Sequence, residues 1–136
     1  YEQLERELGD KLPANVVLTA FLKRMDLAYA CADIVIARAG AGTISELCLL
    51  KKTAVLIPSP NVAEDHQTKN ALALVNKQAA VMLKDSEAAD KLIPALSELL
   101  DHPEQLKLLS ENIAGLAMPD SDTKIAREIL NLIGNK

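Results

Sequence analysis

Aromatic residues are nearly absent from this sequence: Trp does not occur, and Tyr1, Phe21 and Tyr29 are the whole supply. The 2% aromatic content leaves Leu, Ile, Val and Ala to form the core. It also removes the platforms on which proteins stack single-stranded nucleic acid. The formal net charge is −4 and no basic run occurs, so we predict that nucleic acid is not a partner.

Long apolar runs and cysteines are also scarce. No stretch approaches the roughly 20 residues that cross a bilayer, and nothing resembles a signal peptide. No basic cluster predicts electrostatic attachment to an anionic membrane. The two cysteines, Cys31 and Cys48, lie inside apolar segments without a CxxC spacing. We therefore predict two buried thiols in a reducing, cytoplasmic setting rather than a disulfide.

The length of 136 residues suffices for one domain with its own core. The composition, 49% hydrophobic and 25% charged, is typical of a folded protein. The sequence starts with Tyr1 rather than Met, and residues 1–8 have the pattern of a helix interior. We therefore expect residues 1–136 to be a single, truncated domain that begins inside a larger protein.

Short apolar runs alternate with helical patterns, as in strand–helix–strand units around a parallel sheet. Four runs are predicted to be strands: residues 16–20, 34–37, 54–57 and 80–83. Helices are predicted between them, at residues 26–32, 43–50 and 66–76. Ligands of such sheets bind beyond the carboxyl ends of the strands, so the loops after Ala20, Ala37, Ile57 and Leu83 are the places to search for a site.

The C-terminal part, about residues 87–135, is predicted to be entirely helical. Its first helix is expected to start late, near Asp90, because Pro94 is best tolerated close to a helix start. Pro103 suits the first turn of the next helix, and an amphipathic helix closes the chain. The predicted fold is therefore α/β, with a Rossmann-like parallel sheet and flanking helices.

The loop after the second predicted strand, residues 38–46, is the strongest candidate site. Gly40 and Gly42 would allow a tight turn and the close approach of a ligand. The helix start would add unpaired N–H groups and about half a positive charge, which suits a diphosphate. The same segment also fits a capping box without any ligand, in which Thr43 and Glu46 satisfy each other's backbone donors. A nicotinamide site is not predicted, because the third glycine of that fingerprint is missing.

The loop after the third predicted strand opens a helix whose first turn is polar. Asp65 is predicted to be the N-cap of this helix. His66, Gln67 and Asn70 supply neutral donors and acceptors of the kind that bind sugar hydroxyls. A polar first turn is also common on an ordinary protein surface, so both interpretations stay open. His66 and His102 are far apart and have no Cys at ligand spacing, so no metal site is predicted.

Three segments in order, at matching spacing, resemble the C-terminal half of the MurG family of bacterial transferases. They are FLKRM at residues 21–25, ADIVIARAGAGTISE at 32–46, and Ile57-Pro58 followed by DHQTKNA at 65–71. The family adds N-acetylglucosamine to the lipid-linked muramyl-pentapeptide precursor of peptidoglycan. The resemblance covers essentially the whole chain. It implies most of the C-terminal domain of a GT-B glycosyltransferase, in which two Rossmann-like domains face each other across a cleft.

The resemblance also implies a binding site for UDP-N-acetylglucosamine. Leu22 falls on the uracil-facing position and would act through its backbone, with Met25 close to the base. Three residues match the turn that holds the diphosphate: Ala41, Gly42 and Thr43. Glu46 matches the carboxylate that accepts the ribose hydroxyls.

The sugar end of the implied site lies in the other loop. His66 and Gln67 match positions that contact the sugar hydroxyls, although some members have glutamine where His66 stands. Asn70 matches a nearby supporting position. Arg38 would lie near the phosphates, and a structural ion pair is an equal alternative for it.

The implied reaction inverts the anomeric centre, because an acceptor hydroxyl displaces UDP directly. The helix start would stabilise the departing diphosphate, and the resemblance implies neither a metal nor another cofactor. The lipid-linked acceptor and the general base belong to an N-terminal domain outside this sequence. We therefore assign no catalytic residue here, expect the chain alone to be inactive, and expect no direct membrane contact from it. The full-length protein is expected to be peripheral on the cytoplasmic face of the cell membrane.

Two other functions remain open at this stage. The chain would fit a separate nucleotide-sugar-binding subunit of a split glycosyltransferase, which acts only with a membrane partner. It would also fit a non-catalytic interaction domain of the same fold. The polar chemistry of all three ligand-facing segments favours nucleotide-sugar binding over the interaction domain.

Overall fold

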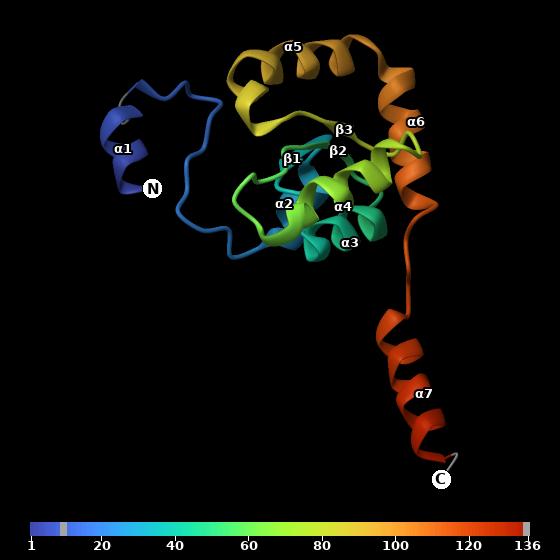
Figure 1. Cartoon of the computed structure of the whole chain (residues 1–136). Coiled ribbons are helices and arrows are strands. Elements are labelled where there is room, and N and C mark those ends of the chain that lie inside the picture. The colour runs from blue at the N-terminus through green and yellow to red at the C-terminus, as the bar shows by residue number, and fades with distance from the viewer. Residues whose placement is uncertain (9–10, 135–136) are drawn as a thin grey trace. The chain divides into compact units, whose positions relative to one another are not determined.

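The computed structural model describes residues 1–8 and 11–134, which divide after Cys31 into two compact units. The first unit contains two short helices, α1 (Glu2–Leu8) and α2 (Met25–Cys31) (Figure 1). Helix α1 has no buried residue, and α2 buries only Tyr29. The helix predicted at residues 26–32 is therefore confirmed to within one residue at each end.

The strand predicted over residues 16–20 is wrong. Its backbone forms no strand, the side chain of Val17 is 88% exposed, and the amide of Val16 donates to the carbonyl of Pro13 in a local turn at 2.9 Å. A β-branched run becomes a strand only where a neighbouring strand accepts its N–H and C=O groups. Within the described residues of the first unit, no such neighbour exists.

The second unit contains a parallel three-stranded sheet with the order β1-β2-β3. Its strands are β1 (Ile34–Ala37), β2 (Thr53–Leu56) and β3 (Val81–Met82). Every residue of the central strand β2 is buried, which explains why its sequence from Ala54 to Leu56 is continuously apolar rather than alternating. The predicted fold class, a parallel α/β sheet with flanking helices, is confirmed.

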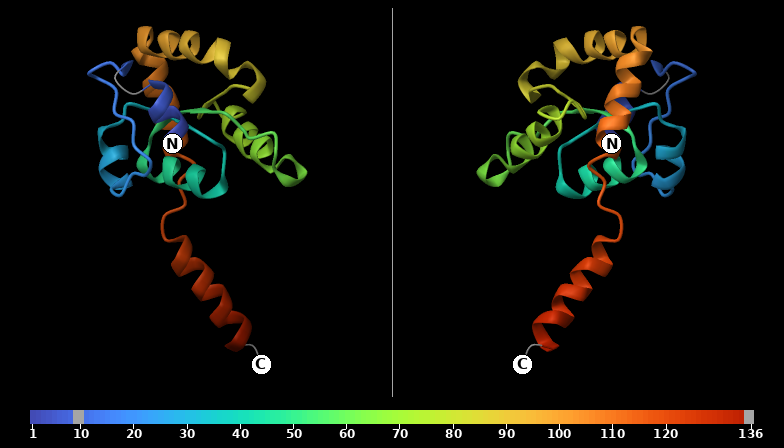
Figure 2. Two further views of the ribbon diagram at one scale, coloured as in Figure 1. Left: turned by 90° about the vertical axis from the view of Figure 1, so that its left-hand side faces the viewer. Right: turned by 90° about the vertical axis from the view of Figure 1, so that its right-hand side faces the viewer.

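Two helices connect the strands, α3 (Ala41–Leu50) between β1 and β2, and α4 (His66–Val75) between β2 and β3. The short 3-10 turn η3 (Asp85–Glu87) then leads into α5 (Ala88–Asp101) and α6 (Pro103–Ala114). One core cluster joins Val55 of β2 to Leu99 of α5 and Leu109 of α6. The course of these helices around the sheet is visible from two sides in Figure 2.

The start of α5 differs from the prediction. The helix begins at Ala88, two residues earlier than expected, so Pro94 lies in its interior. Turn η3 feeds directly into the helix, and Leu99 is buried while Leu92 and Leu96 pack against the core. This burial holds the helix together across the missing N–H of the proline. Pro103 takes the first helical position of α6, as predicted.

The last helix, α7 (Ser121–Gly134), is amphipathic but buries no residue. Its apolar side chains are exposed: Ile125, Ile129, Leu130, Leu132 and Ile133. Among the helices of residues 1–8 and 11–134, none combines the length and apolar character that a bilayer crossing demands.

Both cysteines are free, and only one of them is buried. Cys48 lies on the inner face of α3, where burial raises the pKa of its thiol. Cys31 is exposed, so the prediction of two buried thiols is wrong for this residue. It is the last residue of the short helix α2, which buries Tyr29 alone.

Candidate functional site

The turn between β1 and α3 presents backbone amides. Helix α3 starts at Ala41, two residues earlier than predicted, and its N-cap is Gly40. The first helical hydrogen bond runs from the amide of Ile44 to the carbonyl of Gly40, at 3.0 Å. The amides of Ala41, Gly42 and Thr43 precede this bond, so they have no partner inside the helix.

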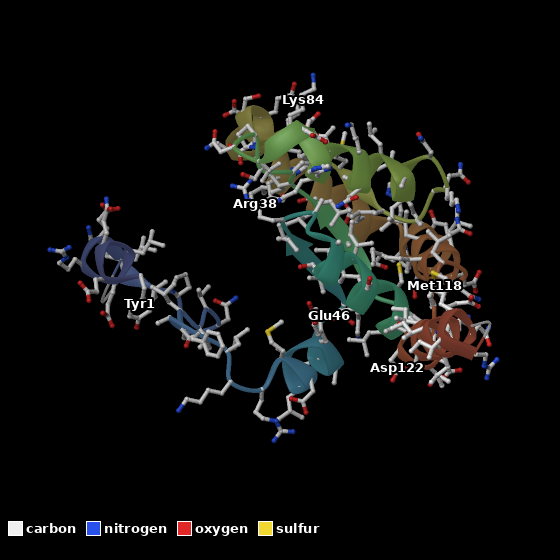
Figure 3. The ribbon with its side chains drawn as sticks, turned by 60° about the horizontal axis from the view of Figure 1, so that its bottom comes forward. Tyr1, Arg38, Glu46, Lys84, Met118 and Asp122 are labelled. Carbon is white, nitrogen blue, oxygen red and sulfur yellow. The ribbon has the colours of Figure 1, made fainter. Side chains whose placement is uncertain are left out.

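The capping-box alternative for this segment is wrong. A capping box needs Thr43 at the N-cap, but that position belongs to Gly40, and the helix start has no side-chain cap bond. Glu46 lies more than one turn into the helix, on its exposed side (Figure 3). The N-cap residue Gly40 therefore supplies no side-chain cap to the amides of the helix start.

The two glycines contribute space rather than an unusual backbone. Gly40 has φ −68° and ψ 146°, an extended conformation that any residue adopts, so the tight-turn argument for it is wrong. Gly42 is helical, and a Cβ placed there would meet no heavy atom within 4 Å. The space in front of Gly42 is open, as the close approach of a ligand requires.

The loop between β2 and α4 is built differently, from unusual backbone and side-chain hydrogen bonds. Glu64 and Asp65 in the turn η2 (Ala63–Asp65) both have positive φ, at 52° and 55°. This left-handed conformation costs roughly 1–2 kcal/mol per residue, so the surroundings must hold it in place. Asp65 is the N-cap of α4, as predicted, but its side chain makes no cap bond.

Two amide side chains of α4 form hydrogen bonds with the backbone of the two connections, the β2–α4 loop and the β1–α3 turn. Gln67 Oε1 accepts a hydrogen bond from the amide of Ser59 at 2.9 Å. Asn70 Nδ2 donates to the carbonyl of Ala39 at 3.2 Å, which links α4 to the β1–α3 turn. The structure thus brings the first turn of α4 beside the start of α3. His66 is exposed, with Nε2 3.6 Å from a carboxylate oxygen of Glu64.

Arg38 forms the ion pair that was one of its two alternatives. Its Nη1 atom donates to the carboxylate of Asp85, to the carbonyl of Ile57 at 3.1 Å and to the carbonyl of Pro58 at 3.3 Å. The side chain of Arg38 therefore points across the sheet end, toward the loop after β2 and the turn after β3 (Figure 3). This arrangement gives it a structural role.

Asp85 is a site residue that is not predicted from the sequence. The sequence indicates only the loop after the fourth predicted strand and no particular residue in it. Asp85 lines a cavity of about 530 Å³ with residues of the β2–α4 loop and a second one of about 300 Å³ with Arg38. The only available signal was the rule that the carboxyl ends of parallel strands meet at one edge of the sheet.

The two residues predicted to face the base lie in the first unit. Leu22 is 47% exposed, and Met25, the first residue of α2, is 42% exposed. Between them, Arg24 pairs with Asp26 at 2.6 and 2.9 Å, and this hydrogen bonding lowers the pKa of the Asp26 carboxyl. The role of Leu22 and Met25 in nucleotide binding stays a prediction.

Metal ligands do not gather in the described part of the chain. Residues 1–8 and 11–134 contain no group of three His, Cys, Asp or Glu side chains that would hold an ion. The site instead offers uncapped amides, a carboxylate on the same helix and the amide side chains of a second helix. Together with the parallel sheet, these features define an α/β domain whose candidate site, at the carboxyl edge of the strands, has the backbone amides that suit an anion.

The comparison with protein families agrees with this class. Residues 1–125 match the family model of the Glycosyltransferase family 28 C-terminal domain, and the chain belongs to this family. The resemblance to the C-terminal domain of a bacterial glycosyltransferase is therefore confirmed.

Several curated relatives have the same name, UDP-N-acetylglucosamine–N-acetylmuramyl-(pentapeptide) pyrophosphoryl-undecaprenol N-acetylglucosamine transferase. The protein of Bacteroides fragilis is 62% identical over 118 residues, which are 87% of this chain and 31% of that protein. The protein of Bacteroides thetaiotaomicron is 60% identical over 118 residues, or 87% of this chain and 32% of that protein. The chain thus spans about a third of the length of these relatives.

A solved structure shows the same fold. The crystal structure of Acinetobacter baumannii MurG matches with a TM-score of 0.78 and 28% sequence identity. The match covers 98% of this chain and 38% of that one. The expectation of a GT-B C-terminal domain fold is confirmed by this likeness.

Proposed function

We propose that this chain is the donor-binding domain of an inverting N-acetylglucosaminyltransferase of peptidoglycan synthesis, and that it binds UDP-N-acetylglucosamine. The observation that carries the proposal is the start of α3, where Ala41, Gly42 and Thr43 present amides without a side-chain cap, facing open space at Gly42. The names of the relatives at 60–62% identity support the choice of donor.

The diphosphate of the donor rests against these amides. A helix start combines N–H donors with a partial positive charge, and both favour an anion. During transfer, negative charge grows on the departing diphosphate. Fixed amides that already point at this position stabilise that charge without reorganising.

The ribose lies next to the diphosphate, within reach of Glu46. This residue is three positions after Thr43 on α3, so both project from neighbouring parts of one helix face. A carboxylate there accepts hydrogen bonds from two ribose hydroxyls. Such charge-assisted bonds contribute about 1.5–3 kcal/mol.

The N-acetylglucosamine lies toward the first turn of α4. His66 and Gln67 contact its hydroxyls, and Asn70 supports the site through its bond to the carbonyl of Ala39. The backbone of Leu22 contacts the uracil, and Met25 lies close to the base. No residue of this chain is assigned to proton transfer, because the general base and the lipid-linked muramyl-pentapeptide acceptor belong to the other domain of the complete transferase. That enzyme acts as a peripheral protein on the cytoplasmic face of the membrane, and the chain alone is inactive.

Substitution of Glu46 tests this assignment. We expect Glu46→Ala to weaken UDP binding about ten- to hundredfold, because a charge-assisted contact is lost. The measurement is isothermal titration calorimetry of this chain with UDP, alongside its melting temperature. Glu128→Ala on α7 is the matched control and is expected to leave the affinity unchanged.

An unchanged UDP affinity in Glu46→Ala, with only a lower melting temperature, would show that this carboxylate has a structural role. Failure of the unmutated chain to bind either UDP or UDP-N-acetylglucosamine would contradict the whole proposal. It would favour the interaction domain of the same fold instead.

A further inference from the structure

Asp85 lies outside the segments that carry the family resemblance, yet it contacts Arg38, which binds the loop after β2. It is the first residue of the turn η3, and Leu83 and Lys84 separate it from the end of β3. Its carboxylate pairs with Nη1 of Arg38, and the same nitrogen donates to the carbonyls of Ile57 and Pro58. One guanidinium therefore joins residues that follow all three strands.

This pair lies at the surface, where it adds little to stability. The side chains of Arg38 and Asp85 are 54% and 38% exposed. Exposed ion pairs contribute little to folding, because water screens the attraction and two side chains must be ordered. The pair does fix a direction, however, since the carboxylate holds the planar guanidinium where its donors meet the two carbonyls.

The carbonyls that accept from Arg38 are next in sequence to Ser59, which contacts the proposed sugar end of the site. Pro58 is followed by Ser59, whose amide donates to Oε1 of Gln67 at 2.9 Å. The position of Gln67 on the first turn of α4 thus depends on a loop whose start is held by Arg38. Gln67 is a residue assigned above to the sugar hydroxyls.

We propose that Asp85 is a positioning residue for the sugar end of the donor site, which acts through Arg38 on residues 57–59 and so on Gln67. The inference rests on the proposed function. A positioning role predicts different effects on sugar binding and on diphosphate binding, which a purely structural role would not. Asp85 affects recognition of the sugar, whereas the diphosphate is held by the amides of α3 and does not depend on it.

The test compares two ligands, UDP and UDP-N-acetylglucosamine, by calorimetry on this chain. We expect Asp85→Ala to weaken UDP-N-acetylglucosamine binding about threefold, no more than the loss of Gln67 itself would, while UDP affinity changes less than about 1.5-fold. Asp85→Glu, which keeps a carboxylate for Arg38, is expected to recover at least half of the lost affinity. Asp90→Ala, an exposed acidic position in the first turn of α5, is the control and is expected to change neither affinity.

The outcomes separate the positioning role of Asp85 from the proposed binding of the UDP-sugar. Equal losses for both ligands, or no loss for either, would overturn the positioning role while leaving UDP-sugar binding intact. Failure of Asp85→Glu to recover any affinity would also overturn it. If the unmutated chain bound neither ligand, the proposed function itself would fail, and the role of Asp85 would fail with it.

Discussion

Two strand-to-helix connections build the candidate site, and they use opposite means. The β1–α3 turn is short, its N-cap is a glycine without a side chain, and its backbone is ordinary. The β2–α4 loop is longer, contains two left-handed residues, and is held by the side chains of Arg38 and Gln67. One connection offers backbone to a ligand, and the other offers side chains.

The difference fits the chemistry of two parts of a nucleotide sugar, the diphosphate and the sugar. A diphosphate is a compact anion, and any helix start with free amides and open space suits it. Sugar hydroxyls differ only in position, so they need side-chain donors and acceptors placed by a fixed loop. Damage to the first connection should therefore abolish nucleotide binding, whereas damage to the second should reduce selectivity for the sugar.

The largest effect should come from a negative charge placed in the first connection. Gly42→Asp puts a carboxylate beside the proposed diphosphate, and we expect UDP affinity to fall about a hundredfold, roughly 2.7 kcal/mol. The free protein should not lose stability, because an acidic side chain in the first helical turn is favourable. Calorimetry with UDP and thermal melting measure the two effects.

The same charge in the second connection provides the contrast. Asn61 is exposed in the β2–α4 loop, and Asn61→Asp adds one negative charge to the chain just as Gly42→Asp does. We expect it to change UDP affinity less than threefold. Similar losses from both variants would mean that net charge, rather than the amides of α3, governs binding.

The elements around the site could be predicted from the sequence where local patterns determine them. The order of β1, α3, β2 and α4 follows from apolar runs and helical spacing, because those patterns are set by burial within each element. The run at residues 16–20 has the same composition as a strand but lacks a partner in its unit, and pairing between distant segments is not written in local composition.

The contacts that join the loops could not be predicted from the sequence either. The bonds from Arg38 to Asp85 and from Asn70 to Ala39 connect residues 47 and 31 positions apart. Polar residues are common near strand ends and in the helices that follow them. Only the three-dimensional structure shows which of them contact one another. Even the capping box, a purely local pattern, was wrong, because α3 starts two residues before Thr43.

A smaller effect should follow when only the space at Gly42 is filled. Gly42→Ala adds a methyl group at a place where, apart from the neighbouring backbone of α3 itself, no heavy atom lies within 4 Å, so the fold has room for it. We expect a gain of about 0.5–1 kcal/mol in the free energy of unfolding, because alanine is the better helix residue. UDP affinity should nevertheless fall about tenfold, since the methyl group keeps the diphosphate away from the amides.

Gly134→Ala on α7 separates these two consequences. Gly134 is also helical and also has open space at its Cβ position. It is expected to leave UDP affinity unchanged. An unchanged affinity in Gly42→Ala as well would show that the open space there is not used by a ligand.

The smallest effect belongs to the second connection. Gln67→Ala removes both the acceptor that holds the Ser59 amide and the donor proposed for a sugar hydroxyl. We expect UDP-N-acetylglucosamine to bind about three- to fivefold more weakly, with UDP changed less than twofold, because a neutral hydrogen bond contributes about 1 kcal/mol. Competition calorimetry with the two ligands measures the ratio.

Gln67→Glu distinguishes the two functions of this side chain, because it keeps an oxygen for Ser59 and loses the N–H donors. The Ser59 amide should stay protected from hydrogen exchange in Gln67→Glu and lose this protection in Gln67→Ala, as measured by nuclear magnetic resonance. If the sugar is bound by the donor, both variants lose the same selectivity despite this difference. If only Gln67→Ala loses it, Gln67 acts by holding the loop, and the sugar is bound by other side chains of the β2–α4 connection.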